Sequence, residues 1–194
     1  LIGGETAEMP GTFRAGCWEV VGALFGLVPE QGHSGTGAPL AAAGLAAAEE
    51  LAHPALVFSM DGVGTKTRVA VAAGRTEGLA SDIIHHSLND ILCQGARGVA
   101  MSFYVGCHRR DEAVLAPLLG AVGARCRDLG LAVLDLQVCE KPRVYLPGGI
   151  DLCAAVAGLV DAERLIQGTA VRGGDVLLGL ASSGLHTNGY SLAR

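Results

Sequence analysis

An ungapped internal repeat constrains the fold of this 194-residue chain more than any other feature of its sequence. Residues 1–30 align with residues 133–162 at a constant offset of 132. Two further pairs, Phe13/Tyr145 and Glu19/Asp151, are chemically similar. The identical pairs are Glu8/Glu140, Pro10/Pro142, Gly16/Gly148, Ala23/Ala155, Gly26/Gly158, Leu27/Leu159 and Val28/Val160. Because turn, loop and strand-like positions match without a gap, the repeat indicates two versions of one supersecondary unit.

Composition excludes several classes of protein. Apolar residues make up 50% of the chain and the net charge is −5, which disfavours a disordered tail and a nucleic-acid binder. No basic segment precedes an apolar one, so no secretory signal is visible. The longest uncharged stretch, 31–48, contains Pro39 and several glycines, and would span a membrane poorly. The six cysteines form no C-x-x-C pair, which favours reduced thiols in a cytoplasmic protein.

Short apolar runs alternate with segments of helical periodicity along the chain. Strands are predicted at 18–28, 56–60, 99–105, 131–136, 152–160 and 176–180. Helices are predicted at 40–51, 67–73, 81–94, 111–129 and from 188 onward. Gly95 and Gly130 stand where helices commonly end, and Pro117 predicts a kink.

The sharpest local signal is Ser59-Met60-Asp61-Gly62-Val63-Gly64-Thr65-Lys66, at the end of an apolar strand. An acid there points its carboxylate beyond the sheet edge, and glycines let backbone amides approach a phosphate closely. The pattern is no Walker A loop, and an ordinary turn explains it about equally well.

A second signal lies on the helix from Ser81. Asp82, His86 and Asn89 share one helix face, with Asp90 beside it. Such groups could hold Mg²⁺, although a solvated polar face is the simpler interpretation. Two loops add further candidates: Glu5 and Glu8 in residues 1–11, and the small hydroxylated stretch 182–191 before the last helix, in which a simple helix cap is the alternative.

Four motifs together resemble one enzyme family. They are Leu-Ile-Gly-Gly-Glu-Thr-Ala-Glu-Met-Pro-Gly at 1–11, Asp-Gly-Val-Gly-Thr-Lys at 61–66, Asn-Asp-Ile-Leu-x-Gln-Gly-Ala at 89–96 and Ser-Ser-Gly-Leu-His-Thr-Asn-Gly-Tyr-Ser-Leu at 182–192. This set resembles the ATP-binding N-terminal domain of aminoimidazole ribonucleotide synthetase, also called phosphoribosylformylglycinamidine cyclo-ligase.

The resemblance implies a two-layer α/β (α+β) domain with a mixed sheet, helices on one face and dimerisation through the sheet. It implies that Mg-ATP phosphorylates the amide oxygen of formylglycinamidine ribonucleotide, after which an amidine nitrogen closes the imidazole ring of this purine precursor. Partners would be that substrate, ATP and a second copy of the chain, in the cytoplasm, without nucleic acid or membrane. Residues 1–30 would form a repeat-like strand and loop segment, and 31–194 the ATP-binding domain, with the family's C-terminal domain absent from this chain.

The resemblance also assigns site residues. The cofactor-binding set is Asp61, Gly62, Gly64, Thr65, Lys66, Asn89 and Asp90; the metal set is Asp61, Asp90, Glu5 and Glu8; the catalytic set is Lys66, His186 and Asn188. One departure concerns the acidic Gly-Gly-Glu loop, which stands at the N-terminus here, while the family's usual place for it, at 135–140, keeps only Glu140. A catalytically dead paralogue that only dimerises or regulates, or another ATP-using member of the superfamily, are the alternatives.

Overall fold

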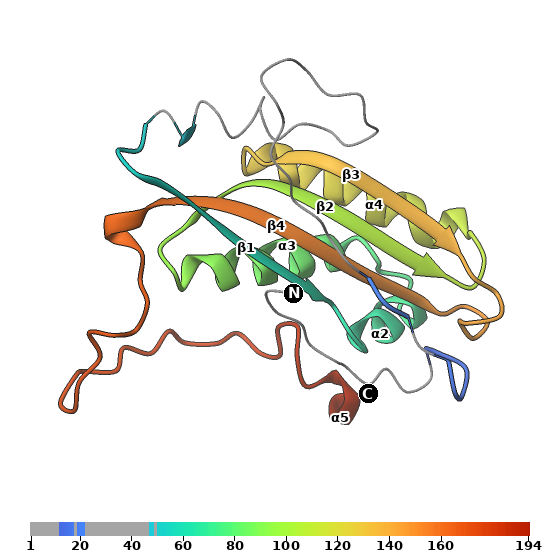
Figure 1. The fold of residues 1–194 in the computed structure, drawn as a ribbon. Coiled ribbons are helices and arrows are strands. Elements are labelled where there is room, and N and C mark those ends of the chain that lie inside the picture. Colours follow the sequence, from blue (N-terminus) through green and yellow to red (C-terminus); the bar gives the residue numbers. More distant parts are fainter. Residues whose placement is uncertain (1–11, 18, 22–46, 49) are drawn as a thin grey trace, which may run out of the picture.

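The computed structural model describes residues 12–17, 19–21, 47–48 and 50–194. Its centre is a four-stranded mixed sheet in the order β1-β4-β2-β3. β4 pairs antiparallel with both β1 and β2, whereas β2 and β3 are parallel. Helices α3 and α4 lie against one face of this sheet (Figure 1). The two-layer α/β arrangement with a mixed sheet is therefore confirmed.

The predicted strands and helices of the central region are present, most of them extended by a few residues. The strands are β1 (Pro54–Gly62), β2 (Arg97–Cys107), β3 (Ala132–Glu140) and β4 (Ile150–Asp161). The helices are α2 (Lys66–Ala72), α3 (Gly78–Leu92), α4 (Glu112–Asp128) and α5 (Tyr190–Ala193), and a short 3-10 turn follows β4 at Ala162–Arg164. None of the helices in the described part is long and apolar enough to cross a lipid bilayer.

Local chemistry explains where the two long helices begin and end. Asp111 caps α4, its carboxylate accepting a hydrogen bond from the Ala113 N–H at 3.0 Å. Gly130 and Gly95 follow α4 and α3 with φ of +67° and +80°, a conformation that glycine adopts without penalty. Pro117 lies in the second turn of α4, where it has no N–H to donate to the Ala113 carbonyl four residues before it.

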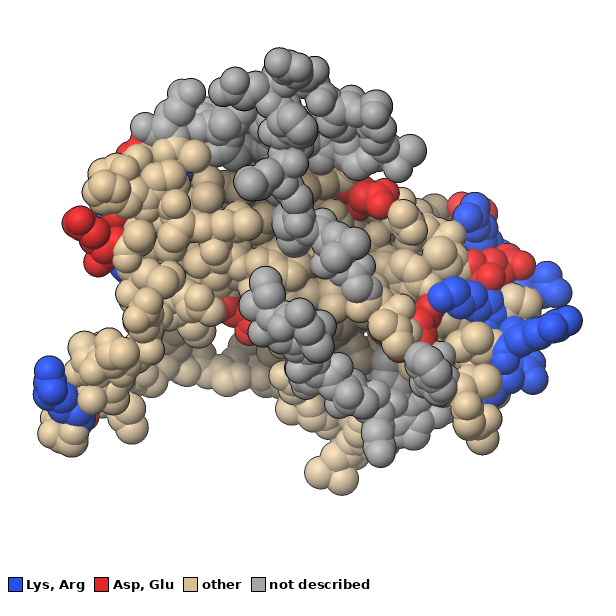
Figure 2. All heavy atoms as spheres, viewed as in Figure 1, with Lys and Arg blue, Asp and Glu red and all other residues tan. Residues whose placement is uncertain are grey.

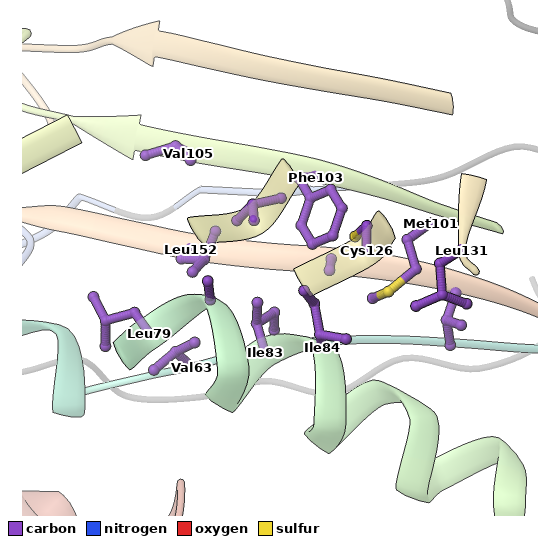
Figure 3. Close-up of a cluster of buried hydrophobic side chains, with 14 of the residues drawn as sticks. Val63, Leu79, Ile83, Ile84, Met101, Phe103, Val105, Cys126, Leu131 and Leu152 are labelled. Carbon is purple, nitrogen blue, oxygen red and sulfur yellow. The ribbon is translucent and has the colours of Figure 1, made fainter. Parts of the chain in front are cut away.

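The core lies between the sheet and the helices (Figure 3). Ile83, Ile84 and Leu79 of α3 meet strand side chains such as Phe103 and Leu152, and all five are at most 3% exposed. β4 is buried along nearly its whole length, and its alternate residues Ile150, Leu152, Ala154 and Val156 belong to this layer. Burial of this apolar layer is the main force that holds helices and sheet together.

Some predicted elements are absent, differently bounded or outside the described residues. The predicted strand at 176–180 is wrong: these residues form no strand, and Leu177, Leu178 and Leu180 are 93–100% exposed. Apolar content alone does not make a strand, because a strand needs a neighbour to satisfy its backbone. The predicted strand at 18–28 and helix at 40–51 lie almost wholly outside the described residues. β1 continues through Asp61 and Gly62, so the motif begins inside the strand rather than after it.

Candidate functional site

A row of polar contacts joins α3 to β1 and the start of α2. Asp82 contacts Lys66, His86 contacts Asp61, and Asp90 accepts a hydrogen bond from the Ser59 hydroxyl at 2.6 Å. The three α3 residues are spaced four apart, so they lie along one helix face. This face is therefore turned toward the strand that carries Asp61, and the solvated-face interpretation is wrong for Asp82 and His86.

Lys66 contacts both α3 and the C-terminal segment of the chain. Its ammonium donates to Asp82 Oδ1 at 2.8 Å and to the His186 carbonyl at 2.6 Å. The same ammonium lies 5.2 Å from the centre of the Tyr190 ring, within cation–π range. The side chains of Lys66 and Asp82 are 21% and 10% exposed, so solvent screens this ion pair only in part.

Asp61 sits near the end of β1 with both carboxylate oxygens engaged. Oδ1 accepts the Gly62 N–H at 2.6 Å, and Oδ2 contacts Nε2 of His86. Its side chain is 30% exposed, so it also faces solvent. A carboxylate held in this way is oriented by the protein rather than free to rotate.

The glycine-rich loop turns the chain from β1 into α2. Gly64 has φ of +74°, which other residues rarely adopt. The Thr67 hydroxyl donates to the Gly64 carbonyl at 3.0 Å, and the Val63 N–H donates to the Leu152 carbonyl at 2.9 Å. These bonds fix the loop against the sheet, so a turn conformation is present whatever ligand the loop binds.

The C-terminal segment returns to this loop. Thr65 and Ser191 share a hydrogen bond at 3.1 Å, and Thr187 is only 3% exposed. The predicted residues His186 and Asn188 are exposed, and His186 reaches Lys66 through its backbone carbonyl. The loop at 61–66 and the segment around 186–191, far apart in sequence, therefore form one site.

The remaining predicted residues are only partly brought to this site. Asp90 joins the row, whereas Asn89 is exposed on the same helix. Glu5 and Glu8 lie outside the described residues. Within the described ranges no three His, Cys, Asp or Glu side chains form a group that could hold a metal ion. The oxygen donors of Asp61 and Asp90 are of the type that Mg²⁺ prefers, but two carboxylates fit such an ion only with further ligands such as water.

The sequence motifs include Ser59, Thr187 and Tyr190 but assign none of them a role in this site. Tyr190 and Thr187 belong to the quoted motif at 182–192, so the motif contained them without indicating their contacts. Ser59 stands two residues before Asp61, and the period of a strand places both side chains on the same sheet face. That spacing was the available signal for a contact with α3.

The segment where the family's acidic loop is expected is part of a strand here. Residues 135–140 belong to β3, and Glu140 accepts the Arg110 N–H at 3.0 Å and lies 3.5 Å from the Arg109 guanidinium. Figure 2 shows Lys and Arg side chains gathered at this end of the molecule, where β2 and β3 end. Glu140 therefore interacts with these two arginines rather than with the loop at 61–66.

The sheet face opposite the helices carries a second polar group. Glu19, whose side chain is 5% exposed, accepts hydrogen bonds from Tyr104, Tyr145 and Lys141. Burial alone would raise the pKa of Glu19, but these bonds outweigh it and hold the pKa below its usual value. A shallow cavity of about 130 Å³ lies beside this group, lined by Val21, Met60, Tyr104 and Gln137 among others.

Known enzymes are similar in sequence to most of this chain. Phosphoribosylformylglycinamidine cyclo-ligase of Symbiobacterium thermophilum is 45% identical over 141 residues, which are 73% of this chain and 40% of that protein. The enzyme of the same name from Nitratidesulfovibrio vulgaris is 43% identical, with the same coverage of 73% and 40%. The chain therefore spans about 40% of the length of these relatives.

A solved structure shares the fold at low sequence identity. The hydrogenase maturation protein HypE, solved in complex with ATP, superposes with a TM-score of 0.50 at 18% identity, over 61% of this chain and 34% of HypE. Residues 43–160, which contain β1 to β4 and the row of contacts on α3, match the family described as AIR synthase related protein, N-terminal domain. This match covers more than half of the chain, so the chain belongs to that family.

Proposed function

We propose that this chain is the ATP-binding portion of a phosphoribosylformylglycinamidine cyclo-ligase. The reaction is the ATP-dependent ring closure of formylglycinamidine ribonucleotide to aminoimidazole ribonucleotide. The observation that carries the proposal is the assembly of Asp61, Lys66 and Asp90 by β1, α2 and α3. These residues lie within 43–160, the range that matches the family, and relatives that bear the cyclo-ligase name are 43–45% identical to the chain over 141 residues. HypE, which has the same fold, was solved with ATP.

The site residues divide into oxygen donors and a cation. Asp61 and Asp90 are the carboxylates that would hold Mg²⁺ on the phosphates, with Asn89 beside them, and Gly62, Gly64 and Thr65 form the loop around the phosphates. Mg-ATP, when bound, supplies the phosphoryl group that activates the substrate amide oxygen. Asp82 holds Lys66 at the start of α2, where the lysine charge would stabilise negative charge on phosphate oxygens.

The exposed residues of the C-terminal segment complete the proposal. His186, whose backbone carbonyl accepts a hydrogen bond from Lys66, and Asn188, two residues further on, are both exposed, so their side chains are free to contact the substrate or the transferred phosphate. Glu5 and Glu8, from the N-terminal copy of the acidic loop, are proposed as additional metal ligands that Glu140 does not supply. If Glu5→Gln leaves turnover unchanged, the N-terminal copy does not contribute to the site.

We further propose the setting in which this domain works. Residues 1–30 form a separate repeat-like segment and 31–194 the ATP-binding domain. A second copy of the chain packs on the sheet face opposite the helices, and the family's C-terminal domain closes the substrate site. A cytoplasmic location agrees with the six cysteines, all of which are free thiols.

Calorimetric titration with ATP tests the nucleotide site. We expect saturable binding of about one ATP per chain in Mg²⁺ and its loss in EDTA. Asp61→Asn should abolish the Mg²⁺-dependent binding while circular dichroism stays unchanged, and Asp128→Asn, an exposed change on α4, should bind as the parent does. If Asp61→Asn binds Mg-ATP as tightly as the parent, the metal assignment is wrong.

The engagement of Glu140 by Arg109 and Arg110 favours one alternative, a paralogue that dimerises or regulates without catalysis. One assay distinguishes an enzyme from such a paralogue. In it the chain is mixed with the C-terminal domain of a relative and with formylglycinamidine ribonucleotide. Ring closure measured as product formation supports the enzyme, whereas nucleotide binding without product supports the paralogue.

A further inference from the structure

His86 reaches across from α3 to the carboxylate of Asp61 on β1. Nε2 of the ring contacts Oδ2 of the carboxylate. The side chains of His86 and Asp61 are 17% and 30% exposed, so the protein shields much of the contact from solvent. An ionised carboxylate only accepts hydrogen bonds, so the ring donates through its Nε2–H. The contact is therefore a directed bond from the helix to a side chain that the proposed function uses as a metal ligand.

The neighbouring carboxylates on α3 have donors of their own. Asp82 and Asp90 stand four residues before and after His86, on the same helix face. Asp82 accepts from the Lys66 ammonium at 2.8 Å, and Asp90 accepts from the Ser59 hydroxyl at 2.6 Å. Each of these carboxylates is thus paired with a donor on the facing element. This pairing leaves the ring of His86 to the carboxylate near the end of β1.

Two donors fix the Asp61 carboxylate through different oxygens. The Gly62 N–H holds Oδ1 at 2.6 Å, and His86 holds Oδ2. A carboxylate has about four acceptor positions, so roughly two of them remain open. These are oxygen lone pairs, which a hard cation such as Mg²⁺ prefers to a ring nitrogen. His86 therefore fits the role of a donor to the metal ligand better than the role of a ligand, which the sequence pattern also allows.

We propose that His86 is a positioning residue, whose Nε2–H bond holds the Asp61 carboxylate in the orientation that binds the metal of Mg-ATP. This inference rests on the proposed function, because it needs Asp61 to be a metal ligand. Removing the hydrogen-bond partner of a metal ligand typically weakens metal binding by about 10–100-fold. Loss of the His86 ring should therefore weaken Mg-ATP binding although every metal ligand is still present.

Calorimetric titration with Mg-ATP compares the parent with His86→Ala and His86→Gln. We expect the Kd of His86→Ala to be higher by about tenfold or more. His86→Gln should stay within about threefold of the parent, because its amide N–H can donate to the same oxygen. His85→Ala is the matched control, at a half-buried position. Neighbouring residues on a helix point about 100° apart, so this variant should bind as the parent does.

Amide exchange in the metal-free chain reports the position of Asp61 without any nucleotide. The Gly62 N–H donates to Oδ1, so its exchange is slowed while the carboxylate stays in place. By NMR we expect exchange at Gly62 to be at least about fivefold faster in His86→Ala and unchanged in His86→Gln. A contact that only stabilises the fold would instead speed exchange throughout α3 and β1, with no separate effect at Gly62.

The parent separates failure of this inference from failure of the proposed function. If the parent does not bind Mg-ATP, the proposed function is wrong and the role of His86 falls with it. If the parent binds and His86→Ala binds equally tightly, only the inference is overturned. Binding by His86→Gln as weak as that of His86→Ala would overturn the hydrogen bond, and an unchanged exchange rate at Gly62 would overturn the positioning. If circular dichroism shows that His86→Ala is unfolded, His86→Leu, which keeps an apolar bulk without a donor, replaces it and must meet the same expectations.

Discussion

The two carboxylate oxygens of Asp82 lie 2.8 Å and 2.7 Å from the ammonium of Lys66. The pair joins the first residue of α2 to the second turn of α3, and so ties the glycine-rich loop to the helix that carries His86 and Asp90. Lys66 is thereby oriented by the protein itself, and in the proposed function this orientation would lower the cost of ordering its side chain on a phosphate.

Asp82→Asn should destabilise the fold through this pair. The change leaves the lysine charge partly buried without its counter-ion, and we expect a loss of about 1–3 kcal/mol in the free energy of unfolding. Urea denaturation measures it. Glu77→Gln breaks an exposed pair with Arg75, 3.5 Å long, and should cost less than about 0.5 kcal/mol. Equal effects of the two changes would show that Asp82–Lys66 behaves as a surface pair.

Gly106→Ala tests how tightly Tyr145 is packed. A Cβ at Gly106 would overlap the Tyr145 hydroxyl and lie 2.6 Å from its Cζ, and Tyr145 is fully buried. The ring would have to move away from Glu19, so we expect a loss of about 1–3 kcal/mol in unfolding free energy. Gly120→Ala, in α4 with nothing within 4 Å of the added carbon, should instead stabilise by about 0.5–1 kcal/mol. A neutral Gly106→Ala would mean that the ring is free to shift.

Periodicity predicts the central helices because each buries one face, whereas the continuous apolar run 152–160 predicts β4, which is buried on both faces. The apolar positions of α3, among them Ile83 and Ile84, fixed its buried side, so its polar side could be assigned as well. Periodicity placed Asn89 on the face of Asp82 and His86, with Asp90 beside it, but in the structure it is Asp90 that contacts β1, through Ser59. The repeat predicted that Phe13 and Tyr145 are equivalent but not that they touch, since equivalence in sequence carries no distance.

The cysteines should differ sharply in reactivity. Cys93 is exposed, whereas Cys107 and Cys126 are buried and burial raises the pKa of both thiols. The thiolate is the reactive form, so both factors slow the buried pair. Alkylation at neutral pH followed by peptide mass spectrometry should label Cys93 first, and Cys107 and Cys126 only after denaturation. Early labelling of Cys126 would show that α4 opens from the sheet.

Asp151 gives the fold a specific dependence on pH. Burial raises the pKa of this carboxyl from 3.8 to about 6, against the opposing effect of the Leu152 N–H bond and with a contribution from Glu19. The folded chain therefore binds this proton more tightly than the unfolded chain does. That contribution to stability is fully present below about pH 4 and is lost as the pH rises through about 6.

Asp151→Asn removes this titration without changing the shape of the side chain. Relative to the parent, the variant should gain about 2 kcal/mol of unfolding free energy between pH 4 and pH 7. Denaturant titrations at four pH values in that window measure the difference, in which the other titrating groups cancel. The exposed Asp128→Asn should give a difference that is flat with pH. A flat difference for Asp151→Asn would mean that the carboxyl is hydrated in the folded chain, because only exclusion of water makes its charged form costly.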